Sequence, residues 1–137
     1  MKERPRLCVG VFVFKEGKLL LLKSHKWENK YIFPSGHVEL MESLEDTVKR
    51  EVYEETNLIV KNIQFLTFIE FINSPEYHKK NLHFVGMQHT CEVESGEVKL
   101  NDEAEEYLWV NIEDSLKLNL EDGTRKAIIF YLRKESL

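Results

Sequence analysis

The chain of 137 residues is 42% hydrophobic and 31% charged, the composition of a globular protein long enough to bury a core of its own. Its formal net charge of −5 disfavours nonspecific binding to nucleic acid or to an anionic membrane. An anionic ligand would need a bound cation or a local basic patch to offset the repulsion. We therefore expect one domain over residues 1–137 that binds a small molecule, with no nucleic acid polymer and no membrane as partner. The composition leaves open whether the chain forms a homodimer.

The first residues lack the pattern of a secretory signal peptide. The apolar run that begins at Leu7 is ended after eight residues by Lys15, and no small-residue cleavage pattern follows. Cys8 and Cys91 lie far apart and form no CxxC pair, so we expect reduced thiols in the core of a cytoplasmic protein. A single disulfide between the two cysteines is the alternative.

Two apolar runs, 6–14 and 18–24, open the predicted fold. Gly17 lies in the turn signal between them, so we expect the two runs to form a β-hairpin. A polar segment follows, and a short strand over residues 31–33 is ended by Pro34, which has no N–H to donate to a sheet.

A glycine-containing loop leads from this strand to a helix. Pro34 fixes a turn, and Gly36 permits a positive φ or the close approach of a ligand to the backbone. Glu39 and Glu42 add two carboxylates before the helix begins. Hard divalent cations prefer oxygen ligands and are commonly shared with substrate phosphates, so we expect Mg²⁺ here, with Mn²⁺ as the alternative.

Residues 43–56 have the period of a helix. Ser43 stands three residues before Asp46, an arrangement typical of a capped helix start. An apolar stripe that includes Val48 and Val52 marks the side expected to face the core.

Three acidic residues of this helix border the apolar stripe. Glu51, Glu54 and Glu55 share one side of the helix, where like charges at this spacing repel each other. Glu55 projects on the apolar side, where the loss of water raises the cost of a charge. A solvated surface helix would place its acids opposite the core, so we expect a metal ion beside these carboxylates.

The later elements complete an α/β pattern. Segments 62–72, 82–94 and 105–111 are rich in β-branched and aromatic residues and are predicted strands, and 122–134 has the helical period. Together the elements predict a mixed sheet covered by helices.

The spacing from Gly36 through Glu42 to REVYEETNL at 50–58 resembles the Nudix box, Gx5Ex7REUxEExGU, in which U is a bulky aliphatic residue. Every charged position of the pattern is present, and the N-terminal hairpin and residues 101–114 are similar to the family as well. The resemblance implies a Nudix-type α/β/α sandwich with helices on both faces of the sheet. It also implies MutT-like hydrolysis of a nucleoside diphosphate linked to another moiety.

The resemblance further implies roles for single residues. The metal ligands would be Gly36, through its carbonyl, with Glu51, Glu54 and Glu55. Arg50 would orient a glutamate through a charge-assisted pair, with a surface pair to Glu54 as the alternative. The general base stays open between Glu51 and Glu103, so the catalytic set is Glu51, Glu54, Arg50 and Glu103.

Two positions depart from the family pattern. Asn57 stands where the box has glycine, and asparagine is the next best residue for the left-handed conformation at a helix end. Ser35 replaces the first glycine of the usual Pro-Gly-Gly turn. Neither change removes an expected metal ligand.

The residues expected to contact substrate are Lys23, Trp27, Tyr31, Glu39 and Asn119. Lys23 would neutralise a polyphosphate, and Trp27 and Tyr31 would contact a base. Glu39 would reach a metal through water, and Asn119 would read the base.

The predicted reaction is metal-assisted attack of water on a pyrophosphate linkage, with a nucleoside triphosphate as the expected substrate and a nucleoside monophosphate and pyrophosphate as products. Residues 96–126 and the compact size look similar to the triphosphate-cleaving members. Pro75 and Tyr77 fall where the ADP-ribose and dinucleoside polyphosphate classes carry marker residues, which keeps those substrates open. A non-catalytic Nudix-fold nucleotide sensor is the alternative of another kind, and the intact box argues against it.

Overall fold

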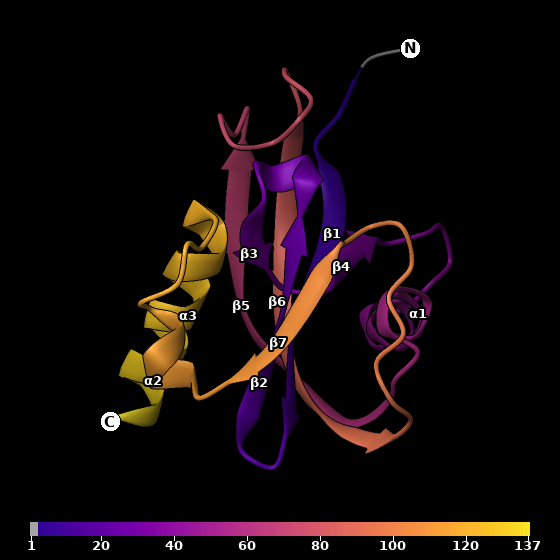
Figure 1. Ribbon diagram of the computed structural model, residues 1–137. Helices are drawn as coiled ribbons and strands as arrows, with labels where there is room; N and C mark the ends of the chain where they lie inside the picture. Colours follow the sequence, from indigo (N-terminus) through magenta and orange to yellow (C-terminus); the bar gives the residue numbers. More distant parts are fainter. Residues whose placement is uncertain (1–2) are drawn as a thin grey trace.

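The computed structural model describes residues 3–137, which form a seven-stranded sheet with helices on both of its faces (Figure 1). The strands are β1 (Arg6–Lys15), β2 (Lys18–Ser24), β3 (Lys30–Ile32), β4 (Ser35–His37), β5 (Ile59–Ile72), β6 (His83–Ser95) and β7 (Glu106–Val110). The helices are the 3₁₀ helix η1 (His25–Trp27), α1 (Leu44–Thr56), α2 (Ile112–Ser115) and α3 (Asp122–Glu135). The predicted α/β/α sandwich is confirmed.

β1 is the central strand of the sheet. It forms the predicted hairpin with β2, pairs in parallel with β6, and pairs antiparallel with β4. The strands follow the order β3-β2-β1-β6-β5, while β4 pairs with β1 and β7 pairs with β2. Gly10 of β1 stands opposite both Ser35 and Gln88. This pairing places β4 and β6 on either side of β1 at the level of Gly10.

Each face of the sheet is covered by its own helix layer. Val11 of β1 belongs to the same buried cluster as Val48 of α1, whereas Phe12, the next residue, shares a second cluster with Ile128 of α3. All four side chains have an exposed fraction of 0%. Burial of one such side chain stabilises by about 1.5–3 kcal/mol, so each helix is held against the sheet by apolar contacts.

α1 begins and ends as the sequence predicts. The Oγ of Ser43 accepts a hydrogen bond from the N–H of Asp46 at 3.1 Å. Asn57 follows the helix with φ 68°, and its N–H donates to the carbonyl of Tyr53 at 2.8 Å. Asparagine tolerates this left-handed conformation, so the loss of the usual glycine leaves the helix end intact.

Some short elements were not predicted. Residues 35–37 were expected in a loop but form β4, and the four-residue α2 gave no signal. β5 begins at Ile59, three residues before the predicted start at residue 62, and its pairing with β6 contains register shifts. Strand pairing depends on hydrogen bonds with distant strands, and a four-residue helix is too short to show a helical period, so the local sequence does not reveal these elements.

The two cysteines are free thiols, as expected, but only Cys91 is in the core, and Cys8 is partly exposed. Burial raises the pKa of both Cys8 and Cys91 to about 12, so neither thiol is activated as a nucleophile. Among residues 3–137, the helices are too short or too polar to cross a bilayer.

Candidate active site

A cavity of about 490 Å³ lies beside the loop that leads into α1. We call the residues Gly36, Glu51, Glu54 and Glu55 its acidic part. We call the side chains Trp27, Phe71, Tyr77 and Phe84 its aromatic part. The acidic part comes from β4 and α1, and the aromatic part comes from η1, β5, β6 and the loop over residues 73–82.

Glu55 is the buried carboxylate of the acidic part, with an exposed fraction of 4%. Its position on the sheet side of α1 follows from the helical period, as the sequence predicted. The N–H of Ser35 donates to its carboxylate at 3.2 Å. Burial, followed by the charge of Glu51, raises the pKa of Glu55 well above its usual range.

Glu51 occupies space that only glycine leaves free. A Cβ atom at Gly36 would stand 2.0 Å from the carboxylate carbon of Glu51, a distance that no packed side chain allows. Burial raises the pKa of Glu51, and the hydrogen bond from Arg50 opposes that shift. Gly36 therefore serves close packing between loop and helix, because its φ is not among the positive ones.

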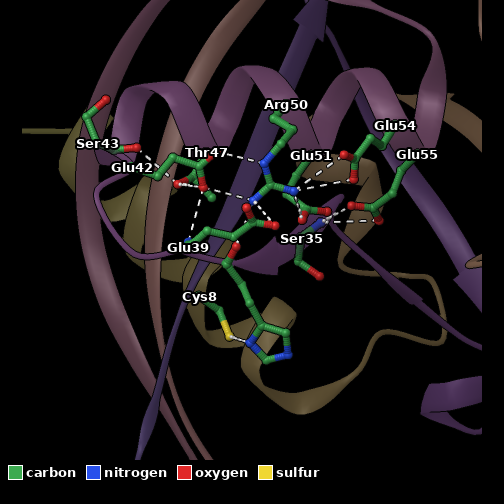
Figure 2. Close-up of polar contacts among 11 residues, drawn as sticks. Cys8, Ser35, Glu39, Glu42, Ser43, Thr47, Arg50, Glu51, Glu54 and Glu55 are labelled. Atoms are coloured by element: carbon green, nitrogen blue, oxygen red, sulfur yellow. Dashed lines mark hydrogen bonds and ion pairs between the residues drawn. The ribbon is translucent and has the colours of Figure 1, made fainter.

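Arg50 joins the acidic residues of the loop and the helix (Figure 2). Its Nε donates to Glu42 at 2.7 Å, and its Nη1 donates to Glu51 at 2.7 Å. The contact of Nη1 with Glu54 is longer, at 3.4 Å. The predicted pair in which Arg50 orients a glutamate is therefore the shorter interaction, and the alternative surface pair with Glu54 is the longer one. Hydrogen bonds from Arg50 and Thr47 hold the pKa of Glu42 at about 2.

The acidic part fits a hard divalent cation in its chemistry. Among residues 3–137, no three His, Cys, Asp or Glu side chains lie close enough together to coordinate one metal ion. The positive charge beside Glu51 is that of Arg50. Glu51, Glu54 and Glu55 nevertheless line one cavity, and two of them have a raised pKa. A cation would relieve that cost, and an oxygen-only donor set suits Mg²⁺ or Mn²⁺.

Glu103 also reaches the cavity, from the segment before β7. The ammonium of Lys26 donates to its carboxylate at 2.7 Å. Its carbonyl accepts from the Oγ of Ser24, and its N–H donates to the Oδ1 of Asn101. The side chain and the main chain of Glu103 are therefore both anchored at the cavity wall.

The five residues expected to contact substrate divide into two groups. Trp27 and Glu39 line the cavity. The structure does not bring Lys23, Tyr31 and Asn119 to it, because β2 and β3 pair with Lys23 opposite Tyr31 and the N–H of Tyr31 donates to the carbonyl of Asn119. The Tyr31 ring packs against the α3 core, and the ammonium of Lys23 lies 6.0 Å from the centre of that ring.

Several cavity residues received no role from the sequence, among them Phe71, Phe84, Gln88 and Glu121. They come from β5, β6 and the start of α3, and no local pattern unites them. Glu121 is 3% exposed, and its carboxylate accepts from the N–H groups of Gly123 and Thr124 at the start of α3. Only the sheet order could have shown that these side chains meet.

Comparisons with known proteins converge on one family. A family model described as NUDIX domain matches residues 4–130. The chain is 29% identical to the nucleoside triphosphatase NudI of Escherichia coli O17:K52:H18 (strain UMN026 / ExPEC), over 91% of this chain and 95% of that protein. It is 34% identical to a probable DHNTP pyrophosphohydrolase of Lactococcus lactis subsp. cremoris (strain MG1363), over 69% of this chain and 58% of that protein. The crystal structure of a MutT NUDIX hydrolase from Burkholderia pseudomallei superposes with a TM-score of 0.80 at 27% identity, over 93% of this chain and 98% of that one.

Proposed function

Since the chain belongs to the NUDIX domain family and is a Nudix hydrolase, we propose that it is a Mg²⁺-dependent pyrophosphohydrolase that cleaves a nucleoside triphosphate to a nucleoside monophosphate and pyrophosphate. One observation carries the proposal: a single cavity combines carboxylates at a glycine loop with four aromatic side chains. The first set suits a metal-bound polyphosphate and the second suits a planar base. Relatives whose names specify nucleoside triphosphates or a pyrophosphohydrolase support this substrate class.

The proposed ligands for the metal are the carbonyl of Gly36 and the carboxylates of Glu51, Glu54 and Glu55. When bound there, Mg²⁺ or Mn²⁺ supplies charge neutralisation of the phosphates and activation of water. Glu51 and Glu54 take part in catalysis, and Arg50 holds the Glu51 carboxylate at 2.7 Å. This pair positions the carboxylate of Glu51 at the cavity.

The reaction itself is a displacement at phosphorus. The oxygen of water forms a new P–O bond, the bridging P–O bond breaks, and the leaving phosphate group takes that electron pair. The proton of the water passes to a carboxylate oxygen, either of Glu51 or of Glu103. Both carboxylates line the cavity, and the ammonium of Lys26 holds the carboxylate of Glu103 with a hydrogen bond of 2.7 Å.

The test is cleavage of each member of a panel of nucleotides with and without Mg²⁺, with the products separated and identified by chromatography. The panel contains the common nucleoside triphosphates, ADP-ribose and a dinucleoside polyphosphate. We expect a nucleoside triphosphate to be the best substrate, and we expect activity to stop when a chelator is added. Preference for ADP-ribose or for the dinucleoside polyphosphate would reassign the substrate, and activity that survives exhaustive metal removal would reject the mechanism.

Calorimetric titration of the same nucleotides separates an enzyme from a nucleotide sensor. If a nucleotide binds in the presence of Mg²⁺ but no member of the panel is cleaved, the chain is a sensor built on the Nudix fold. Mg²⁺ should also raise the melting temperature of the protein, because a ligand that binds the native state stabilises it by mass action.

A further inference from the structure

Gln88 of β6 carries a buried acceptor that the protein itself does not use. Its side chain is only 4% exposed. Its Nε2 donates to the carbonyl of Gly86 at 3.3 Å, whereas its Oε1 has no hydrogen-bond partner among residues 3–137. A flipped amide would set two oxygens against each other at Gly86, so the geometry fixes Oε1 as the free atom.

Two glycines make the room for this amide. A Cβ atom at Gly10 would stand 2.4 Å from the Oε1 of Gln88, and one at Gly86 would stand 2.9 Å from its Nε2. Neither glycine has a positive φ, so the backbone does not require glycine at these positions. The absence of side chains there lets Gln88 lie across the sheet at the cavity.

The free acceptor shares the cavity with the aromatic part. The ring centroids of Trp27 and Tyr77 lie 4.5 Å apart, and those of Tyr77 and Phe84 lie 5.4 Å apart. Glu121, another buried polar side chain of the cavity, is already occupied by the N–H groups that begin α3. Within residues 3–137, the Oε1 of Gln88 is the buried side-chain acceptor of this cavity that lacks a partner, so it is the group available to a planar ring among these aromatic side chains.

We propose that Gln88 selects the base of the substrate, its Oε1 accepting a hydrogen bond from an exocyclic amino group. This rests on the proposed function and narrows it to bases such as guanine, adenine, cytosine or a pterin. Uracil and thymine have no exocyclic amino group. Their ring N–H lies between two carbonyl oxygens, and these oxygens would repel the lone pairs of the Oε1 of Gln88. Discrimination follows because a ligand without a donor leaves a buried acceptor unpaired.

The experiment compares substrates that differ by one amino group. GTP is paired with ITP, ATP with purine riboside triphosphate, and CTP with its analogue lacking the 4-amino group. In the pair that contains the best substrate, we expect kcat/KM to fall by at least about tenfold when the amino group is removed. In Gln88→Met, which keeps the length and removes the amide, we expect the two members to differ by less than about twofold.

Two further variants keep the outcome interpretable. Gly10→Ala should also reduce the discrimination. Residue 88 is still glutamine in this variant, but the new Cβ atom at position 10 displaces its Oε1. Gln64→Met, the same change at an exposed position of β5, should keep the wild-type ratio. A wild-type ratio near one would overturn the proposal, as would a Gln88→Met variant that loses activity equally on both members of the pair.

Binding of the same pairs, measured by calorimetry, separates this proposal from the proposed function. Discrimination by the amino group in binding, without cleavage of any pair, would reject the hydrolytic activity and keep Gln88 as the selecting residue. Cleavage without discrimination would keep the activity and reject the role of Gln88.

Discussion

The two parts of the cavity are built in different ways. The acidic part is contributed by one continuous stretch, residues 36–55, in which a loop runs into α1. The aromatic part combines side chains from η1, β5, β6 and the loop over residues 73–82. The first part is therefore encoded by local spacing, and the second exists only after the sheet has formed. We expect the acidic part to set the rate and the aromatic part to set the affinity.

The largest effect should come from Glu51→Gln. Glutamine keeps the shape of the side chain but removes a charge that binds metal or takes a proton, so kcat should fall by roughly 10²-fold or more. Burial raises the pKa of Glu51 despite its ion pair with Arg50, so the charged form costs stability and the metal-free variant should have an equal or higher free energy of unfolding. Steady-state kinetics with Mg²⁺ and urea denaturation of the metal-free protein measure the two effects, with Glu45→Gln on the exposed first turn as control. Normal turnover in Glu51→Gln would remove Glu51 from the catalytic set.

Trp27→Ala should change affinity more than rate. Stacking of a base on an aromatic side chain contributes about 1–3 kcal/mol, so KM should rise roughly tenfold while kcat stays within about threefold. Trp27→Phe should recover most of the affinity, because it keeps an aromatic face beside Tyr77. A fall in kcat at unchanged KM would contradict the expectation that the aromatic part sets the affinity and the acidic part sets the rate.

The acidic part could be predicted because its physical demands are local. The helical period places Glu55 on the buried side of α1, and the spacing of Gly36 and Glu51 reflects a contact that would exclude a Cβ atom. Ser43 and Asn57 likewise predict the two ends of the helix, because serine is favoured at a helix start and asparagine tolerates the left-handed conformation at a helix end. The sequence could not show that Arg50 prefers Glu42 and Glu51, since that choice depends on the folded loop.

Apart from Trp27, the aromatic part could not be predicted, because its neighbours are set by long-range pairing. Gln88 meets Gly10 only because β1 and β6 pair in parallel, a register that neither strand specifies alone. Tyr31 was expected to contact a base on its residue type, but the pairing of β3 with β2 turns it toward the α3 core. Aromatic residues fit a core and a ligand site equally well, so only the sheet order distinguishes them.

The role of Glu42 can be separated from that of the buried acids by pH. Its pKa of about 2 in the folded state lies below the value of about 4.3 of an unfolded glutamate, so its ionised form stabilises the fold. This contribution is complete above the unfolded pKa and is lost as pH falls through the folded pKa. The free energy of unfolding of the wild type should therefore exceed that of Glu42→Gln near neutral pH, and the difference should shrink between about pH 4.3 and pH 2.

Urea denaturation across this pH range measures the difference, and Glu45→Gln corrects for the change in net charge. A difference that stays constant down to pH 2 would mean that the charge of Glu42 does not account for its contribution.

The smallest effect is expected at the end of α1. Asn57→Gly removes the strain of a left-handed asparagine, and it also removes the hydrogen bond from its Nδ2 to the carbonyl of Glu97 at 3.3 Å. The two changes oppose each other, so the free energy of unfolding should shift by no more than about 1 kcal/mol, and kcat should stay nearly unaltered. A large change in kcat would show that Asn57 affects the acidic part beyond ending the helix.

The most direct test of the central claim is Glu55→Gln, with turnover and stability measured on the same preparation. Glu55 is 4% exposed and lies beside the charge of Glu51, so removing its charge should leave the metal-free protein equally stable or more stable. Its kcat with Mg²⁺ should nevertheless fall by roughly 10²-fold or more. An unfolded metal-free variant whose remaining folded fraction turns over at the normal rate would show that these carboxylates serve the fold and not the reaction.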